Sequence, residues 1–163
     1  HTLIVSFMTI TLLFELALLP YAVFFGIAVY YFMAPCYDKL SSSAFIEFFQ
    51  NLDPYMKVWA LRLLLMQIAL TLTLLGCLYV QRTSTPFGLT LVALLMAVTS
   101  LVIGIKGNVP INRQMDQWSP TQLPVDWQQI RDRWLRYHSF RGGAEAVGFL
   151  ALLSASLLYT SRL

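Results

Sequence analysis

The stretch that decides the fold is Phe87–Ile105, FGLTLVALLMAVTSLVIGI, which carries no charged residue. A helix needs about 20 mostly apolar residues to cross the hydrocarbon core of a bilayer. Within lipid the backbone must satisfy its own hydrogen bonds, and a helix does so inside one segment. The stretch therefore predicts a transmembrane helix. The whole chain agrees, since 58% of its 163 residues are hydrophobic and 12% are charged, against about 25% charged residues in soluble domains.

Three more apolar stretches flank this one, at Thr2–Met33, Val58–Val80 and Gly143–Tyr159. The first is too short for two spans, so we expect one helix, bent or tilted at Pro20. Gly143–Tyr159 is short for a span and can be extended backwards. The predicted fold is all-α, a four-helix transmembrane bundle in one domain (1–163). The predicted spans are 2–33, 58–80, 87–105 and 143–159, and amphipathic segments in the polar connections 34–57 and 106–142 cap one membrane face.

The positive charges are distributed unequally between the two ends of this bundle. Four spans place both termini on one side, where Arg82 and Arg162 are the only Lys or Arg residues. The other nine of the eleven lie on or near the side of the long connections. Cytoplasmic loops carry an excess of Lys and Arg, so we expect the long connections to be cytoplasmic.

The composition also bears on partners and thiols. The net charge is only +3, with no run of basic residues, which excludes a nucleic-acid-binding protein. The lipid bilayer is the expected environment, and the oligomeric state is left open. Cys36 and Cys77 lie near or inside apolar segments, and we interpret them as free thiols.

One polar stretch, WQQIRDRWLRYHSFRGG (Trp127–Gly143), stands directly before the last span. Asp126 is a candidate helix N-cap, with Gln129 three residues on. Residues spaced by three and four positions share one face of a helix. That face would carry Trp127, Arg131, Trp134, His138, Arg141 and Glu145, whereas Arg133 and Arg136 point elsewhere.

This face has two interpretations. Trp and Arg side chains are common at the depth of lipid headgroups, and Trp127 and Arg131 fit such an interfacial belt. Arg141 and Glu145 lie deeper, where ionisable groups pair or line a polar cavity. They form either a structural salt bridge or, with His138, the wall of a pocket. The Gly142-Gly143 pair marks a kink or a close approach of another backbone.

Two further polar segments lie on the same side. In GNVPINRQMDQW (Gly107–Trp118), Pro110 is expected to block a simple helical continuation. Asn108 and Asn112 either form a turn at the membrane exit or present amides at the mouth of the bundle. MAPCYDKLSSSAFIEFFQNLDP (Met33–Pro54) contains a predicted amphipathic segment, Ala44–Leu52. Together they indicate a pocket at one end of the bundle, with the candidate lining residues Tyr30, Tyr31, Asn51, Arg62, Asn108, Asn112, His138 and Arg141.

The order of these motifs resembles the anthrone oxygenase family of small four-span membrane proteins. The resemblance rests on GIAVYYFMAP, FIEFFQNLD and GNVPINRQM, followed by Trp-x3-Arg-x2-Trp-x3-His-x2-Arg before the last span. It implies oxidation of a polycyclic aromatic polyketide, an anthrone, by molecular oxygen as co-substrate and without another cofactor. Glu15 and Glu145 match no feature of the family pattern.

The resemblance also implies roles for the candidate residues. His138 is the base that removes a proton from the anthrone CH2, and Arg141, or Arg131, stabilises the developing oxyanion. The remaining expectations concern substrate binding: hydrogen bonds from Asn108 and Asn112 to its oxygens, and stacking of Trp127 and Trp134 on its rings.

Two alternatives remain open from the residues themselves. A metal-dependent membrane oxygenase would need ligands, and the chain offers one internal histidine and no recognisable ligand spacing. His1 would suit copper, but it belongs on the opposite membrane face from His138. A non-enzymatic carrier, lipid-binding protein or assembly partner would use Glu15 and Arg62 as a polar path or as an ion pair.

Overall fold

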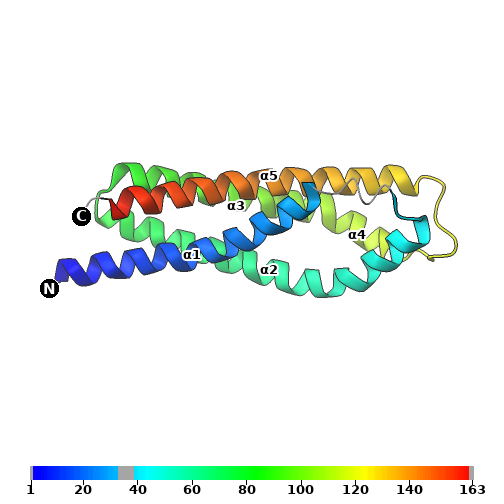
Figure 1. Ribbon diagram of the computed structural model, residues 1–163, viewed down its shortest axis with the longest axis horizontal. Coiled ribbons are helices and arrows are strands. Elements are labelled where there is room, and N and C mark those ends of the chain that lie inside the picture. The colour runs from blue at the N-terminus through cyan, green and yellow to red at the C-terminus, as the bar shows by residue number, and fades with distance from the viewer. Residues whose placement is uncertain (1, 33–38, 162–163) are drawn as a thin grey trace.

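The computed structural model describes residues 2–32 and 39–161, and every regular element in these ranges is helical except for an isolated bridge between Ser119 and Gln122 (Figure 1). All four main helices are long and apolar enough to cross a membrane. This confirms the predicted four-helix transmembrane bundle. The elements are α1 (Thr2–Phe32), α2 (Ser42–Val80), α3 (Ser84–Ile103), η2 (Gly104–Asn108), α4 (Val109–Met115) and α5 (Trp127–Thr160).

The helices pack with α5 against both α1 and α3, and with α2 against the same two helices. Both termini and the α2–α3 turn lie at one end of the bundle, and the loop that joins α4 to α5 lies at the other (Figure 1). At the first end Arg82 takes a positive φ of 54°, and the Tyr159 hydroxyl donates a 2.8 Å hydrogen bond to the Gln81 side-chain oxygen. The end that carries the long connections is called the loop end below.

Two helices extend well beyond their predicted spans. α2 begins at Ser42 and runs through Pro54 without interruption, so the predicted amphipathic segment Ala44–Leu52 and the span at Val58–Val80 are one helix. At 1.5 Å per residue its 39 residues measure about 58 Å, longer than the hydrocarbon core of about 30 Å. The loop-end half of α2 therefore has room to project beyond the hydrocarbon.

α5 likewise contains both the polar stretch and the last span. Asp126 occupies its N-cap position, but its side chain makes no capping hydrogen bond. The Gly142-Gly143 pair does not interrupt the helix. A Cβ atom on Gly142 would lie 2.8 Å from Cβ of Ala28, so this glycine allows α1 and α5 to approach closely, the second of its two predicted roles.

The helix continues past Pro110, although not as a simple α-helix. α3 continues into the π-helical turn η2 and then into α4, in which Pro110 stands in the first turn. The Val109 N–H donates to the carbonyl of Gly104, five residues back. Proline lacks an N–H and is tolerated where a helical turn begins. The wider turn lets the chain accommodate Pro110 and carries the polypeptide on to Met115.

The interior contains two separate groups of buried hydrophobic side chains. The larger fills the bundle between α1, α2, α3 and α5 and includes Phe14, Tyr21 and Leu74. The smaller lies at the loop end and includes Phe45, Met115 and Trp134. There the Gln50 amide donates hydrogen bonds to the carbonyls of Met115 (3.1 Å) and Trp118 (2.9 Å), which fixes the end of α4 against α2.

Candidate functional site

A cavity of about 430 Å³ opens between the two hydrophobic groups, in the loop-end half of the bundle. Small-molecule pockets cover about 300–1,000 Å³, so its size suits an organic ligand. All helices contribute side chains. The lining residues are Phe24, Ile27, Phe45, Phe48, Phe49, Leu52, Asp53, Met56, Lys57, Ala60, Leu61, Leu64, Ser100, Leu101, Gly104, Ile105, Asn108, Val109, Asn112, Trp134, His138 and Arg141.

Aromatic rings form one end of the cavity. The Trp134 ring meets Phe49 edge to face, with centroids 5.7 Å apart, and Phe45 at 6.4 Å. These three side chains are buried. Edge-to-face packing fixes ring orientation, so this end presents fixed aromatic surfaces to a ligand.

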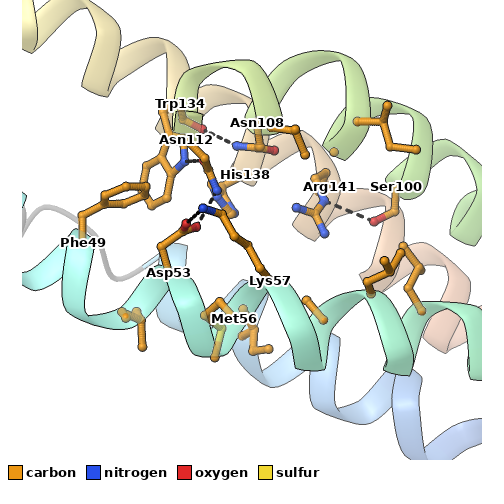
Figure 2. Close-up of a pocket in the computed structure, with 18 of the residues that line it drawn as sticks. Phe49, Asp53, Met56, Lys57, Ser100, Asn108, Asn112, Trp134, His138 and Arg141 are labelled. Atoms are coloured by element: carbon orange, nitrogen blue, oxygen red, sulfur yellow. Dashed lines mark hydrogen bonds and ion pairs between the residues drawn. The ribbon is translucent and has the colours of Figure 1, made fainter. Parts of the chain in front are cut away.

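Two ionisable side chains of α5 follow Trp134 along the same wall. His138 lies one turn further on and contacts the indole with ring centroids 4.2 Å apart. Arg141 comes next, and its Nε donates a 3.5 Å hydrogen bond to Oγ of Ser100 on α3 (Figure 2). Gly104 leaves room for the guanidinium, because a Cβ atom there would lie 3.4 Å from Cζ of Arg141. The cavity therefore holds an imidazole and a fixed cation side by side.

Asn108 adds a hydrogen-bond acceptor. Its side chain is buried, and its Nδ2 donates a 3.3 Å hydrogen bond to the backbone carbonyl of Trp134 (Figure 2). Its Oδ1 has no hydrogen-bond partner among residues 2–32 and 39–161. An unpartnered buried polar atom costs about 1–3 kcal/mol. A ligand hydroxyl that reached it would recover that cost.

Asn112 is bound on both sides. Its Oδ1 accepts a 2.7 Å hydrogen bond from the Trp134 indole N–H, and its Nδ2 donates a 2.7 Å hydrogen bond to Oδ1 of Asp53 on α2. Asp53 also pairs with Lys57, and Lys57 pairs with Asp116 at 2.6 Å. The network joins α2, α4 and α5 across the loop end.

Asp53 and Lys57 line the cavity without having been singled out from the sequence. Their spacing of four residues is a recognisable helical ion-pair signal. Pro54 stands between them, inside α2.

Five of the seven predicted site residues line the cavity: Asn108, Asn112, Trp134, His138 and Arg141. Trp127 and Arg131 do not. Arg131 pairs with Asp132 at 2.9 Å, and its guanidinium lies over the Trp127 ring, 5.2 Å from the centroid. Trp127 itself packs near Phe45, with centroids 6.2 Å apart. A role for these two residues in binding substrate stays a prediction.

Of the other candidate lining residues predicted from the sequence, two lie away from the cavity and two have side chains outside the described part of the chain. Asn51 is exposed and donates to the Glu47 carbonyl within α2, and Arg62 lies over the Trp59 ring, 5.7 Å from its centroid. Neither lines the cavity. The side chains of Tyr30 and Tyr31, and all of His1 and Cys36, lie outside the described residues; Cys77 is a free thiol.

Within the described part of the chain, no three His, Cys, Asp or Glu residues come together in a group that could hold a metal ion. The polar groups of the cavity are instead an imidazole, a guanidinium, two amides, a hydroxyl and one Asp–Lys pair. Such a set suits proton transfer and the binding of oxygen-bearing groups.

Comparison with known proteins gives one match. A family model described as anthrone oxygenase matches residues 55–151, which is more than half of the chain and includes Asn108, Trp134, His138 and Arg141. No curated protein and no solved structure matches. Over this range, the chain belongs to the anthrone oxygenase family.

Proposed function

We propose that this protein is a membrane-embedded oxygenase that oxidises a polycyclic aromatic substrate of the anthrone type with molecular oxygen. The observation that carries the proposal is the placement of His138 and Arg141 beside each other in a largely apolar, aromatic-walled cavity. Family membership supports an oxygenase of this kind. The bilayer is the natural source of so apolar a substrate.

In this reaction the protein itself has to supply little beyond proton transfer. The CH2 of an anthrone, opposite its carbonyl, is acidic, and its loss of a proton gives an electron-rich anthrolate. The anthrolate passes an electron to oxygen, and recombination forms a C–O bond as a peroxide. Loss of the second CH2 hydrogen as a proton, with cleavage of the O–O bond, gives the quinone carbonyl. One anthrone and one O2 thus yield one anthraquinone and one water.

Each cavity residue has a role in this scheme. His138 acts as the base, because one ring nitrogen of a neutral imidazole can accept a proton. Arg141 stabilises the oxyanion that forms on the substrate, and such electrostatic stabilisation is commonly the largest catalytic contribution. Trp134 and Phe49 contact the rings, and Oδ1 of Asn108 accepts a hydrogen bond from a substrate hydroxyl. Neither a metal nor a flavin takes part in this scheme.

Asn112 has a more limited role than the one inferred from the sequence. Its oxygen and one amide hydrogen are engaged by Trp134 and Asp53. Only its second amide hydrogen is available to a substrate oxygen. We therefore propose that Asn112 mainly holds Trp134 in place.

The test uses the purified full chain in lipid nanodiscs with an anthrone under air. Oxygen uptake and the absorbance of the quinone product report turnover. General acid–base catalysis contributes about 10²–10⁴-fold, so His138→Ala is expected to lose at least 100-fold in kcat. Ser139→Ala, at an exposed neighbouring position, is the matched control.

Three results would contradict the proposal. Turnover at the wild-type rate in His138→Ala removes the base assignment. Saturable binding of the anthrone by the wild-type protein without oxygen uptake supports the carrier or lipid-binding alternative. Activity that disappears on chelation and returns with an added metal supports the metal-dependent oxygenase.

A further inference from the structure

A second, smaller chamber lies beside the main cavity, towards the middle of the bundle. Its volume is about 30 Å³, and a cavity holds one water once it exceeds about 10–15 Å³. The side chains that line both chambers, and so stand between them, are Phe24, Ile27, Ser100, His138 and Arg141. The chamber adds three residues of its own, Ala28, Gly142 and Glu145.

Among the described residues, Glu145 is the one carboxyl group that lines this chamber. It is 2% exposed, and its Oε2 accepts a 2.8 Å hydrogen bond from Nε2 of Gln67 on α2. Its Oε1 is buried without a hydrogen-bond partner in 2–32 and 39–161. The chamber is therefore polar and large enough for a water that would satisfy this oxygen.

We propose that Glu145 is the proton-exchange partner of His138, acting through a water in the small chamber. The inference rests on the proposed function, in which His138 takes a proton from the substrate. The imidazolium then gives a proton to the water while the water gives one to the Glu145 carboxylate. One proton moves, no electron is transferred, and the water is regenerated.

The physical reason is the charge beside His138. An imidazolium next to the Arg141 guanidinium places two positive charges together in a bundle of low dielectric constant. Transfer of the proton from the imidazolium to the carboxylate leaves both side chains neutral. Burial disfavours charged forms, so the transfer removes two charges from a site that solvates them poorly. The base is then ready for the second CH2 proton.

Glu145 acts through His138 rather than on the substrate, so it is a positioning residue in this proposal. A purely structural role is the competing interpretation, because the Gln67–Glu145 hydrogen bond joins α2 to α5. The two roles predict different results for Glu145→Gln. The amide retains an oxygen to accept from Gln67 but cannot take up a proton.

The experiment measures kcat for oxygen uptake, the affinity for the anthraquinone product, and the anthrolate absorbance when anthrone binds without oxygen. We expect Glu145→Gln to lower kcat at least tenfold and to reduce the anaerobic anthrolate band. We also expect quinone affinity to stay within twofold of wild type. Glu145→Asp should recover part of both signals, since it retains the carboxyl group. Glu15→Gln, at an exposed carboxyl group on α1, is the matched control.

The outcomes separate this inference from the proposed function. If the wild-type protein turns over and Glu145→Gln has the same kcat and the same anthrolate band, the relay is overturned and the proposed function stands. A loss of quinone affinity in parallel with kcat assigns Glu145 a structural role and also overturns the relay. A wild-type protein that neither forms anthrolate nor consumes oxygen overturns the proposed function and the relay with it.

Discussion

The indole N–H of Trp134 donates a 2.7 Å hydrogen bond to Oδ1 of Asn112, and through it α5 is connected to α4. The Asn112 amide passes the connection on to Asp53 of α2 at 2.7 Å. One side chain thereby accepts from the Trp134 indole and donates to one oxygen of the buried Asp53 carboxylate. The hydrogen bond to Asn112 therefore adds to the packing against Phe45 and Phe49 in setting the orientation of Trp134.

Asn112→Leu tests that dependence. The substitution preserves the size of the side chain but leaves the Trp134 donor and Asp53 without this partner. Loss of one partner costs about 1–3 kcal/mol for each buried group left unsatisfied, so the apparent Tm in detergent should fall. Asn51→Leu is the control, because Asn51 is exposed and bonds only within α2. Equal Tm values for the two variants would show that the network contributes nothing to stability.

The site was partly predictable from the sequence because three of its predicted residues lie on one helix, α5. The spacing of Trp134, His138 and Arg141 fixes a common face of α5, and all three line the cavity. The same face includes Trp127 and Arg131 by spacing alone, yet the cavity ends before them. Periodicity gives the direction of a side chain, whereas the extent of a cavity depends on which other helices lie opposite.

Glycines that allow close helix contacts give a second stability prediction. A Cβ atom on Gly148 would lie 2.7 Å from Cε1 of Tyr21 and 3.3 Å from Cβ of Met96, whereas one on Gly26 meets nothing within 4 Å. Overpacking costs about 1–3 kcal/mol. Gly148→Ala should therefore lower the apparent Tm, and Gly26→Ala should not. A Gly148→Ala protein as stable as wild type would mean that Tyr21 moves aside at no cost, although its hydroxyl donates a 2.7 Å hydrogen bond to the Ala93 carbonyl.

The fold was more predictable than the local path of its helices. Charge-free runs such as Phe87–Ile105 specify spans through composition alone. The same reasoning placed a break at Pro110, because proline removes a helical hydrogen bond. The π-turn Gly104–Asn108, which accommodates Pro110, packs closely against α5. A Cβ atom at Gly107 would lie 2.7 Å from the Tyr137 ring of that helix. A contact between two helices cannot be predicted from the helix propensity of either segment alone.

The predicted sidedness can be tested by cysteine labelling. Ser84 and Ser119 are both exposed. Ser84 begins α3, after the α2–α3 turn, and Ser119 lies in the loop that joins α4 to α5, so they belong to opposite ends of the bundle. In a background with Cys36→Ser and Cys77→Ser, a membrane-impermeant maleimide added to intact cells should label Ser84→Cys and not Ser119→Cys. The excess of Lys and Arg near the loop end is the reason. Labelling in inside-out vesicles should give the opposite result, and labelling of Ser119→Cys in intact cells would reverse the assignment.

The last prediction concerns the cation of the site. Arg141→Gln removes the charge that stabilises the oxyanion, and loss of one such group costs about 10²–10³-fold in kcat. Arg141→Lys retains the charge but loses the planar, forked geometry, so its kcat should lie between those of Arg141→Gln and wild type. KM should change little, because the oxyanion develops after the substrate binds. Arg136→Gln, at an exposed position on the same helix, should match wild type. A fall in kcat of the same size in Arg136→Gln, or none in Arg141→Gln, would exclude Arg141 as the oxyanion partner.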